Sequence, residues 1–201
     1  MAPPLIDCWP LFLPDGRIVQ KSATISKRRV YSGRVIALDV DQVEFPNGSV
    51  GELEMVRHPG ASAVVPFLTD PTGDDPQILL IRQYRYAAEQ YLLEIPAGKL
   101  DPGESPADCA RRELLEETGC TATRVEHLIT VYTTPGFTDE KIHLYMATGL
   151  TMGESRPEHD EFIEIEAKPL SQVLLMIERG EIVDGKTLVA ILYAAGYRLG
   201  R

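Results

Sequence analysis

The chain lacks the features that mark secreted, membrane-spanning and disulfide-dense proteins. Its three cysteines, Cys8, Cys109 and Cys120, are odd in number and do not have the spacing of metal ligands, so a reduced cytosolic setting is expected. The N-terminal segment has neither a basic leader nor an unbroken apolar stretch, which argues against a signal peptide. The longest apolar runs, Val173–Ile177 and Leu188–Ala195, are too short to span a bilayer. We therefore expect a cytoplasmic protein.

Positive charge is also scarce, because 20 Lys and Arg stand against 30 Asp and Glu and give a net charge of -10. Nucleic acids and anionic membranes attract proteins with a basic footprint, so neither is an expected partner. An acidic protein can still bind an anionic substrate when divalent ions bridge the two. The composition is otherwise that of an ordinary globular protein, which a length of 201 residues allows to hold one catalytic domain and a small extra element.

The first part of the chain predicts an appendage. Residues 1–28 are interpreted as an irregular, proline-rich arm. Apolar and polar residues then alternate over 34–45, an Asn-Gly turn follows, and residues 50–56 resume the extended pattern, which predicts a β-hairpin. An isolated hairpin is marginally stable, so it must pack on the main domain or on another subunit. We divide the chain into an arm and hairpin, residues 1–57, and a catalytic domain, residues 58–201.

The rest of the chain mixes short strands with a few helices. Strands are predicted at residues 63–68, 78–84, 91–95, 125–132, 142–148 and 162–167, and helices at 106–118, 171–179 and 187–198. These elements show no regular βαβ repeat, which favours an α+β sandwich over a doubly wound sheet.

The helix predicted at 106–118 has signals at both ends. Ser105 is a good N-cap, Pro106 suits the first helical position and Asp108 places a negative charge in the first turn. Gly119 can adopt the left-handed conformation that ends a helix. Its boundaries are therefore well defined by local sequence.

Three glutamates of this helix lie on one face. Glu113, Glu116 and Glu117 are spaced by three and four residues, so their mutually repelling carboxylates gather within roughly a third of the circumference. Arg112 is the one basic neighbour able to relieve them, and a solvated acidic face is one interpretation. The preceding loop adds a fourth carboxylate, Glu104, and clustered oxygen ligands suit Mg²⁺ or Mn²⁺. We favour a metal site whose carboxylates face solvent and metal.

This segment resembles the signature of the Nudix hydrolases. It consists of Gly98, five residues, Glu104, seven residues, Arg112-Glu113-Leu114, one residue, Glu116-Glu117, one residue and Gly119-Cys120. The last position, usually aliphatic in the family, holds the small apolar Cys120. The resemblance implies an α/β/α sandwich with a mixed sheet and two or three divalent ions per site, Mg²⁺ or alternatively Mn²⁺.

The resemblance also implies roles for the residues of this signature. Glu113 and Glu117, assisted by Glu116 and the main-chain carbonyl of Ala97, would hold the ions. Glu104 and Arg112 would orient these ligands through charge-assisted hydrogen bonds. Water at such ions loses a proton more readily and attacks one phosphorus of a diphosphate.

The flanking sequence narrows the substrate. Residues 80–85 and 134–140 resemble the ADP-ribose pyrophosphatase branch of the family, and Pro135 lies sixteen residues beyond Gly119, a spacing typical of that branch. The resemblance implies hydrolysis of ADP-ribose to AMP and ribose 5-phosphate. Another nucleoside diphosphate sugar, such as GDP-mannose, remains an alternative. A catalytically silent Nudix-fold sensor is a third reading, which the intact glutamates disfavour.

Several substrate contacts follow from the same resemblance. Arg85 and Arg82 would bind the phosphates or the terminal ribose, although Arg82 also fits a surface strand position. Glu140 would accept a hydrogen bond from a ribose hydroxyl, and Pro135 and Gly136 would contact the substrate.

The general base is expected in the acidic stretch before the last strand. Glu161 keeps an acidic position of the family and is our preferred base. His159, which replaces the other acidic position, and Asp160 are the alternatives.

The hairpin at 34–56 corresponds to the element that this branch exchanges between two subunits. A homodimer is therefore implied, with nucleotide-sugar substrate bound at sites completed by the partner. Tyr31 and Arg34 become candidates for adenine contacts, and ordinary strand packing or exposure explains them equally well.

Overall fold

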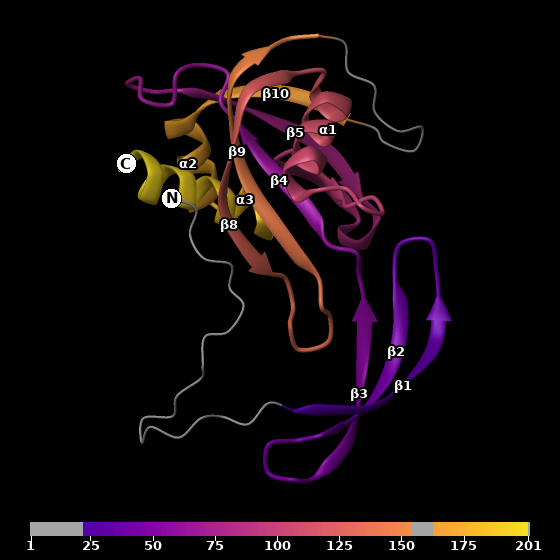
Figure 1. The fold of residues 1–201 in the computed structure, drawn as a ribbon. Coiled ribbons are helices and arrows are strands. Elements are labelled where there is room, and N and C mark those ends of the chain that lie inside the picture. The colour runs from indigo at the N-terminus through magenta and orange to yellow at the C-terminus, as the bar shows by residue number, and fades with distance from the viewer. Residues whose placement is uncertain (1–21, 154–162, 201) are drawn as a thin grey trace. The chain divides into compact units, whose positions relative to one another are not determined.

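The computed structural model describes residues 22–153 and 163–200, and the chain divides into two compact units (Figure 1). One unit comprises the chain up to His58 together with Gly136–Thr138. The other comprises Pro59–Pro135 and Asp139–Arg201. No helix among the described residues combines the length and apolar character needed to cross a membrane.

The N-terminal unit is a three-stranded antiparallel sheet in the order β1-β2-β3. Strands β2 (Ala37–Glu44) and β3 (Val50–Arg57) form the predicted hairpin. Strand β1 (Ala23–Ser32) pairs with β2, so the assignment of residues 23–28 to an irregular arm was wrong. All ten residues of β1 are exposed, and two register shifts interrupt its pairing. Because no face of β1 is buried, its sequence carries no alternating apolar pattern.

Ion pairs tie β1 to this sheet. Arg29, from the basic cluster at 27–29, binds the buried carboxylate of Asp39 on β2. Arg57 on β3 donates from Nε to the same carboxylate at 3.1 Å and also binds Asp41. The hydrogen bond from Arg29 holds the pKa of Asp39 below its usual value. The Arg29–Asp39 ion pair therefore adds to the backbone pairing that joins β1 to β2.

The described residues of the larger unit, Pro59–Pro135 and Asp139–Arg201, form two sheets and five helical segments. A mixed sheet has the order β7-β4-β9-β8, in which β4 and β9 run parallel. A second, antiparallel sheet has the order β10-β5-β6. The strands are β4 (Ala61–Pro66), β5 (Gln77–Arg85), β6 (Gln90–Glu94), β7 (Ala97–Lys99), β8 (Thr121–Tyr132), β9 (Lys141–Thr151) and β10 (Ile163–Pro169). The helical segments are α1 (Pro106–Thr118), α2 (Leu170–Glu178), α3 (Gly185–Tyr193), the 3₁₀ turn η1 (Tyr86–Ala88) and the π-helical η2 (Ala194–Leu199).

A helix packs against each face of the mixed sheet. Val64 of β4 packs in the cluster that includes Leu114 of α1, whereas its neighbours Ala63 and Val65 pack in the cluster that includes Ile191 of α3. Successive residues of a strand point to opposite faces, so α1 and α3 cover opposite sides of this sheet (Figure 1). The α/β/α sandwich expected from the sequence is confirmed.

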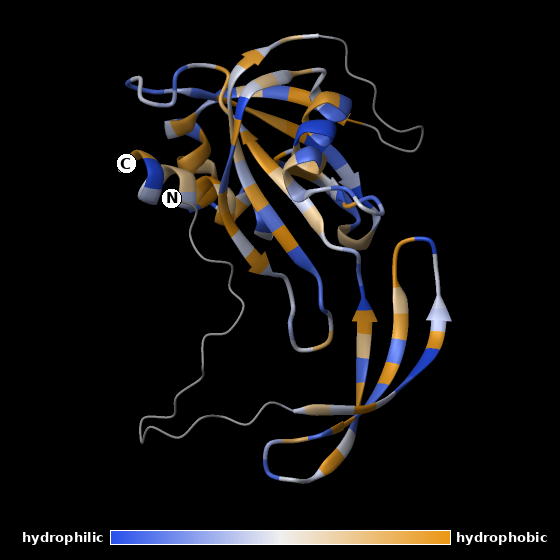
Figure 2. Ribbon diagram, in the orientation of Figure 1, coloured by the Kyte–Doolittle hydropathy of each residue, from blue (hydrophilic) through white to orange (hydrophobic). Residues whose placement is uncertain are grey.

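Burial on both faces explains why the central strands could be recognised. Apart from its first residue, all residues of β4 are buried, and β5 contains a buried apolar run, visible as apolar colouring along these strands in Figure 2. The short strand β7 was not predicted, because its Ala-Gly-Lys sequence has no apolar pattern. The predicted helix at 187–198 is divided between α3 and η2.

Helix α1 begins and ends where its capping residues predicted. Ser105 Oγ accepts a hydrogen bond from the Asp108 backbone N–H at 3.2 Å, and Pro106 is the first helical residue. Gly119 has a φ of 71° and donates its N–H to the Leu115 carbonyl at 2.8 Å.

Removing this cap should weaken the fold. Ser105→Ala leaves the first turn of α1 without its side-chain acceptor, so the free energy of unfolding should fall by about 1 kcal/mol. Urea unfolding followed by far-UV circular dichroism measures the change, with Ser105→Asp as a control that keeps an acceptor. Equal stability of Ser105→Ala and the unsubstituted protein would contradict the capping role.

Candidate active site

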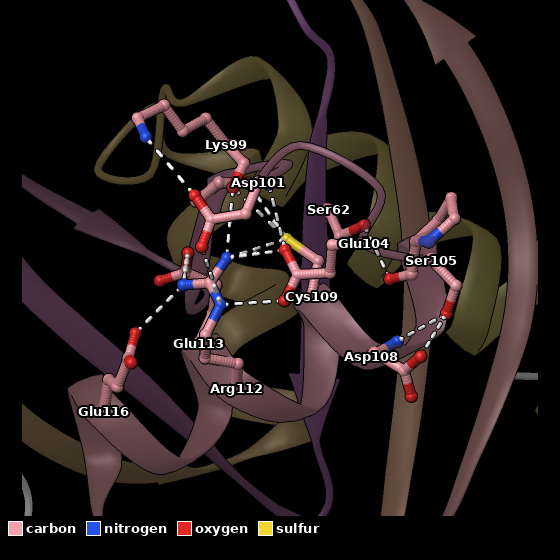
Figure 3. Close-up of polar contacts among 12 residues, drawn as sticks. Ser62, Lys99, Asp101, Glu104, Ser105, Asp108, Cys109, Arg112, Glu113 and Glu116 are labelled. Carbon is pink, nitrogen blue, oxygen red and sulfur yellow. Dashed lines mark hydrogen bonds and ion pairs between the residues drawn. The ribbon is translucent and has the colours of Figure 1, made fainter.

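Arg112 is the centre of the polar cluster formed by α1 and the loop before it (Figure 3). Its Nε and Nη2 donate to the two carboxylate oxygens of Glu104 at 2.8 and 2.9 Å. Its Nη1 donates to Glu113 at 2.6 Å and to Glu116 at 3.0 Å. Nη2 also reaches the Lys99 carbonyl at 3.1 Å. One guanidinium therefore holds three carboxylates and the loop backbone together.

The charges in this cluster shift one another's protonation. The hydrogen bonds from Arg112 lower the pKa of Glu104 to about 2, and the backbone N–H of Asp101 assists them. Hydrogen bonding to Glu104 in turn raises the pKa of Arg112. Glu104 therefore remains an anion, and Arg112 a cation, across the whole physiological range.

Two of the helix carboxylates are buried, although we expected the carboxylates of Glu116 and Glu117 to face solvent and metal. Glu117 is 1% exposed, and its Oε2 accepts a hydrogen bond from the Ala97 N–H at 3.0 Å. Glu113 is 7% exposed. Glu116, whose side chain is 35% exposed, is the one that matches the expectation. The cause is packing, because this face of α1 lies against the backbone of β7.

Gly98 leaves room for the carboxylate of Glu113 beside β7. A Cβ on Gly98 would lie 1.8 Å from Glu113 Oε1, so any other residue here would displace this carboxylate. The backbone beside Ala97 and the carboxylates of Glu113 and Glu117 therefore meet at one place. Glycine here serves contact distance, not backbone conformation.

The donor atoms gathered at this place fit a hard divalent cation. Carboxylate and peptide oxygens are the ligands that Mg²⁺ and Mn²⁺ prefer, and the site offers both kinds. Within residues 22–153 and 163–200, no three acidic, histidine or cysteine side chains stand in a ready ligating arrangement. Glu113 and Glu116 turn oxygens toward Arg112, and Glu117 turns one toward Ala97.

The two arginines assigned to substrate differ in their surroundings. Arg85, at the end of β5, forms two hydrogen bonds to Glu94 at 2.8 and 2.6 Å. Arg82 pairs with Glu166 of the neighbouring strand β10 at 2.7 Å. Both side chains are partly exposed, 40% for Arg85 and 38% for Arg82.

The remaining sequence candidates fall in several places. Glu140 accepts a hydrogen bond from Thr133 Oγ1 at 2.8 Å at the base of the loop between β8 and β9. Pro135 belongs to the larger unit and Gly136 to the N-terminal unit. Tyr31 and Arg34 belong to the N-terminal unit, where both are exposed. Glu161, His159 and Asp160 lie outside the described residues.

A second group of charged residues was missed at the sequence level. Glu94 is 1% exposed and binds both Arg85 and Lys186. Asp184 binds Lys186 at 3.0 Å and caps α3 by accepting from the Thr187 N–H at 3.0 Å. An acidic residue at the end of an apolar strand and the Asp-Gly-Lys-Thr cap were the available signals. Neither signal reveals that the two segments meet.

Three comparisons with known proteins agree with this geometry. The model of the NUDIX domain family matches residues 58–189. The chain is 42% identical to ADP-ribose pyrophosphatase of Bacillus subtilis, over 85% of this chain and 90% of that protein, and 44% identical to the methanol dehydrogenase activator of Bacillus methanolicus over the same shares. It is 33% identical to GDP-mannose pyrophosphatase of Yersinia enterocolitica, over 77% and 83%. A crystal structure of an ADP compounds hydrolase superposes with a TM-score of 0.77 at 24% identity, covering 92% of this chain and 97% of that one, which shows the fold.

The Glu104–Arg112 pair should make stability depend on pH. The pKa of Glu104 is about 2 in the folded protein and about 4.3 in an unfolded chain. A lowered pKa contributes stability that is fully present above the unfolded value and is lost as the pH falls toward the folded value. The stability difference between the protein and Glu104→Gln should therefore be largest near pH 6 and narrow from about pH 4.3 downward.

Urea unfolding of both proteins at pH 6, 5, 4 and 3 measures this difference. Carboxylates outside the Arg112 cluster titrate alike in the two proteins, so subtraction removes their contribution and leaves that of Glu104 and its cluster. A difference that is the same at every pH would show that the pair does not shift the pKa.

Proposed function

The chain belongs to the NUDIX domain family, and we propose that it hydrolyses the pyrophosphate bond of ADP-ribose to AMP and ribose 5-phosphate. The observation that carries this proposal is the set of carboxylates that Arg112 gathers where α1 meets β7. Glu117, the remaining glutamate of the family signature, lies on the same helix and accepts a hydrogen bond from the Ala97 N–H. The 42% identity to an ADP-ribose pyrophosphatase over most of both chains supports the choice of substrate.

The reaction requires a divalent metal ion, as in the family generally. Glu113, Glu116, Glu117 and the main-chain carbonyl of Ala97 would hold it, with two or three ions per site and Mg²⁺, or alternatively Mn²⁺, as the ion. When bound, such ions neutralise charge on the phosphoryl oxygens and make a nearby water more acidic. The ions would compete with Arg112 for the oxygens of Glu113 and Glu116. Arg112, which Glu104 holds in place, would keep these ligands close together and oriented.

Substrate binding is assigned to residues around this cluster. Arg85 and Arg82 would provide positive charge to the phosphates, and their partly exposed side chains suit that role. Glu140 would accept a hydrogen bond from a ribose hydroxyl, and Pro135 and Gly136 would contact the substrate. Glu161 is proposed as general base, with Asp160 and His159 as the alternatives.

We further propose that residues 1–57 serve as a dimerisation element and residues 58–201 as the catalytic domain. The three-stranded sheet exposes the apolar side chains of Ile25, Val30, Tyr31 and Val50 to between 51 and 57%. Exposed apolar groups on one sheet favour burial against a partner, here a second copy of the chain. Tyr31 and Arg34 would then contribute adenine contacts. A cytoplasmic setting fits the two buried free thiols of Cys109 and Cys120.

A second candidate substrate is GDP-mannose. The relative from Yersinia enterocolitica that is 33% identical to this chain bears the name GDP-mannose pyrophosphatase. The chemistry at phosphorus would be the same, because the signature residues act on the diphosphate and not on the base or the sugar. A silent sensor is disfavoured, since such a module has no use for the complete carboxylate set.

A substrate panel tests the proposal directly. Purified protein is incubated with Mg²⁺ and, in turn, ADP-ribose, GDP-mannose, NADH, ADP-glucose and diadenosine polyphosphates, and release of nucleoside monophosphate is measured. The highest kcat/KM is expected for ADP-ribose. A preference for GDP-mannose would retain the mechanism and change the substrate, whereas no release with Mg²⁺ or Mn²⁺ would favour the sensor.

Glu116 is the most informative ligand to change. Glu116→Gln keeps the size of the side chain and removes the charge that attracts the metal, so kcat should fall by about 10²-fold or more. Because this carboxylate is partly exposed, the unfolding midpoint should change little. Glu178→Gln, at an exposed helix position, is the matched control and should retain full activity. Full activity of Glu116→Gln would refute the metal assignment.

A further inference from the structure

Two basic and two acidic side chains form a second charged cluster where β5 and β6 end and α3 begins. Lys186 donates from Nζ to Glu94 Oε2 and, at 3.0 Å, to Asp184 Oδ2. Glu94 also receives Nε and Nη2 of Arg85, at 2.8 and 2.6 Å. The single carboxylate of Glu94 therefore joins the lysine of α3 to the arginine of β5.

This cluster is largely shielded from water. Among its side chains, Glu94 is 1% exposed, Lys186 11% and Asp184 17%. Two positive and two negative charges balance, which a set of buried ionic groups requires. Without Lys186, the Asp184 carboxylate would lose the cation that it binds, and Arg85 would be the remaining cation at Glu94. The Glu94–Arg85 pair would then be less firmly fixed.

The position of Lys186 is set by a helix start. Asp184 accepts from the Thr187 N–H at 3.0 Å and from Thr187 Oγ1 at 2.6 Å, so it caps α3 while binding Lys186. Thr187 Oγ1, which is fully buried, also accepts from the Ile95 N–H at 3.0 Å. The backbone directly after Glu94 is thereby attached to the same turn of α3. The first turn of α3 therefore fixes both Lys186, which belongs to it, and Glu94, whose neighbour Ile95 is bonded to it.

Arg85 is held on one edge and open on the other. Nε and Nη2 are used by Glu94, whereas Nη1 makes no hydrogen bond or ion pair with the described residues. The Arg85 side chain is 40% exposed, so this edge can reach a ligand. A guanidinium fixed through one edge presents the other at little entropic cost, which suits a phosphate oxygen.

We propose that Lys186 is a positioning residue that acts through Glu94 to fix Arg85 for the phosphates of the substrate. The inference rests on the proposed function, because it assigns Arg85 to a diphosphate. Lys186 itself is too deeply buried to touch substrate. Its effect passes through the bidentate Glu94–Arg85 pair and must disappear when Arg85 is absent.

A double-mutant cycle tests this dependence. The kcat and KM for ADP-ribose are measured for the unsubstituted protein, Lys186→Met, Arg85→Ala and the double variant, well below each unfolding midpoint. Lys186→Met should lower kcat/KM about 10- to 100-fold, the usual cost of losing a residue that orients a site. In the Arg85→Ala background the same change should cost less than about twofold, because coupled residues are not additive.

Two further variants separate positioning from general destabilisation. Lys186→Arg retains a cation at this place and should restore kcat/KM to within about threefold of the original. Arg124→Met removes a cation that pairs with Glu126 at 2.7 Å on β8, a strand of the other sheet, and should leave kcat/KM unchanged. A lysine with a merely structural role would lower the unfolding midpoint without this pattern.

The outcomes distinguish this inference from the proposed function. If the unsubstituted protein hydrolyses ADP-ribose and Lys186→Met has the same kcat/KM, the inference alone is overturned. Equal losses from Lys186→Met with and without Arg85 would have the same consequence. A protein that releases no nucleoside monophosphate from any substrate of the panel would overturn the proposed function, and the inference with it.

Discussion

The site depends on holding several like charges close together, and the guanidinium of Arg112 is what makes this arrangement stable. Glu104, Glu113 and Glu116 each bind this one cation. Without it, carboxylates one helical turn apart would repel one another and turn outward. The same guanidinium reaches the Lys99 carbonyl, so it attaches the loop that enters α1 to the helix itself. The cluster is thereby kept compact, with its carboxylates close to one another around Arg112.

The short segment 94–99 is where the two layers of the sandwich act on the site together. From one side, α1 contacts it through the Glu117–Ala97 hydrogen bond and the tight approach of Glu113 to Gly98. From the other side, α3 contacts it through Thr187 at Ile95 and Lys186 at Glu94. Two separate hydrophobic clusters thus set the position of one backbone segment. A shift of either helix would therefore disturb this segment and the side chains that it carries.

Reaction class and substrate identity reside in different parts of the molecule. In our proposal the signature residues of α1 hold the metal and act on the diphosphate, which all these substrates share. Relatives that are 42% and 44% identical to this chain accordingly bear different names, ADP-ribose pyrophosphatase and methanol dehydrogenase activator. Recognition of the base and sugar has to come from other residues. The exposed side chains of the N-terminal sheet and the loop between β8 and β9 are where we place it.

Local signals in the sequence determined α1 to the residue, since a cap, a first-turn proline and a terminal glycine act within four positions. The central strands could also be predicted, because strands buried on both faces have continuous apolar runs. The reaction class followed from the resemblance of the spaced motif to the family signature. Local signals did not reveal β1, which pairs with β2 through the backbone and has no buried residue. The burial of Glu117 and the contact between Glu94 and Lys186, 92 positions apart, were decided by packing alone. The physical reason is that neighbours in sequence set backbone conformation, whereas the environment of a charge is set by whichever distant segments the fold brings beside it.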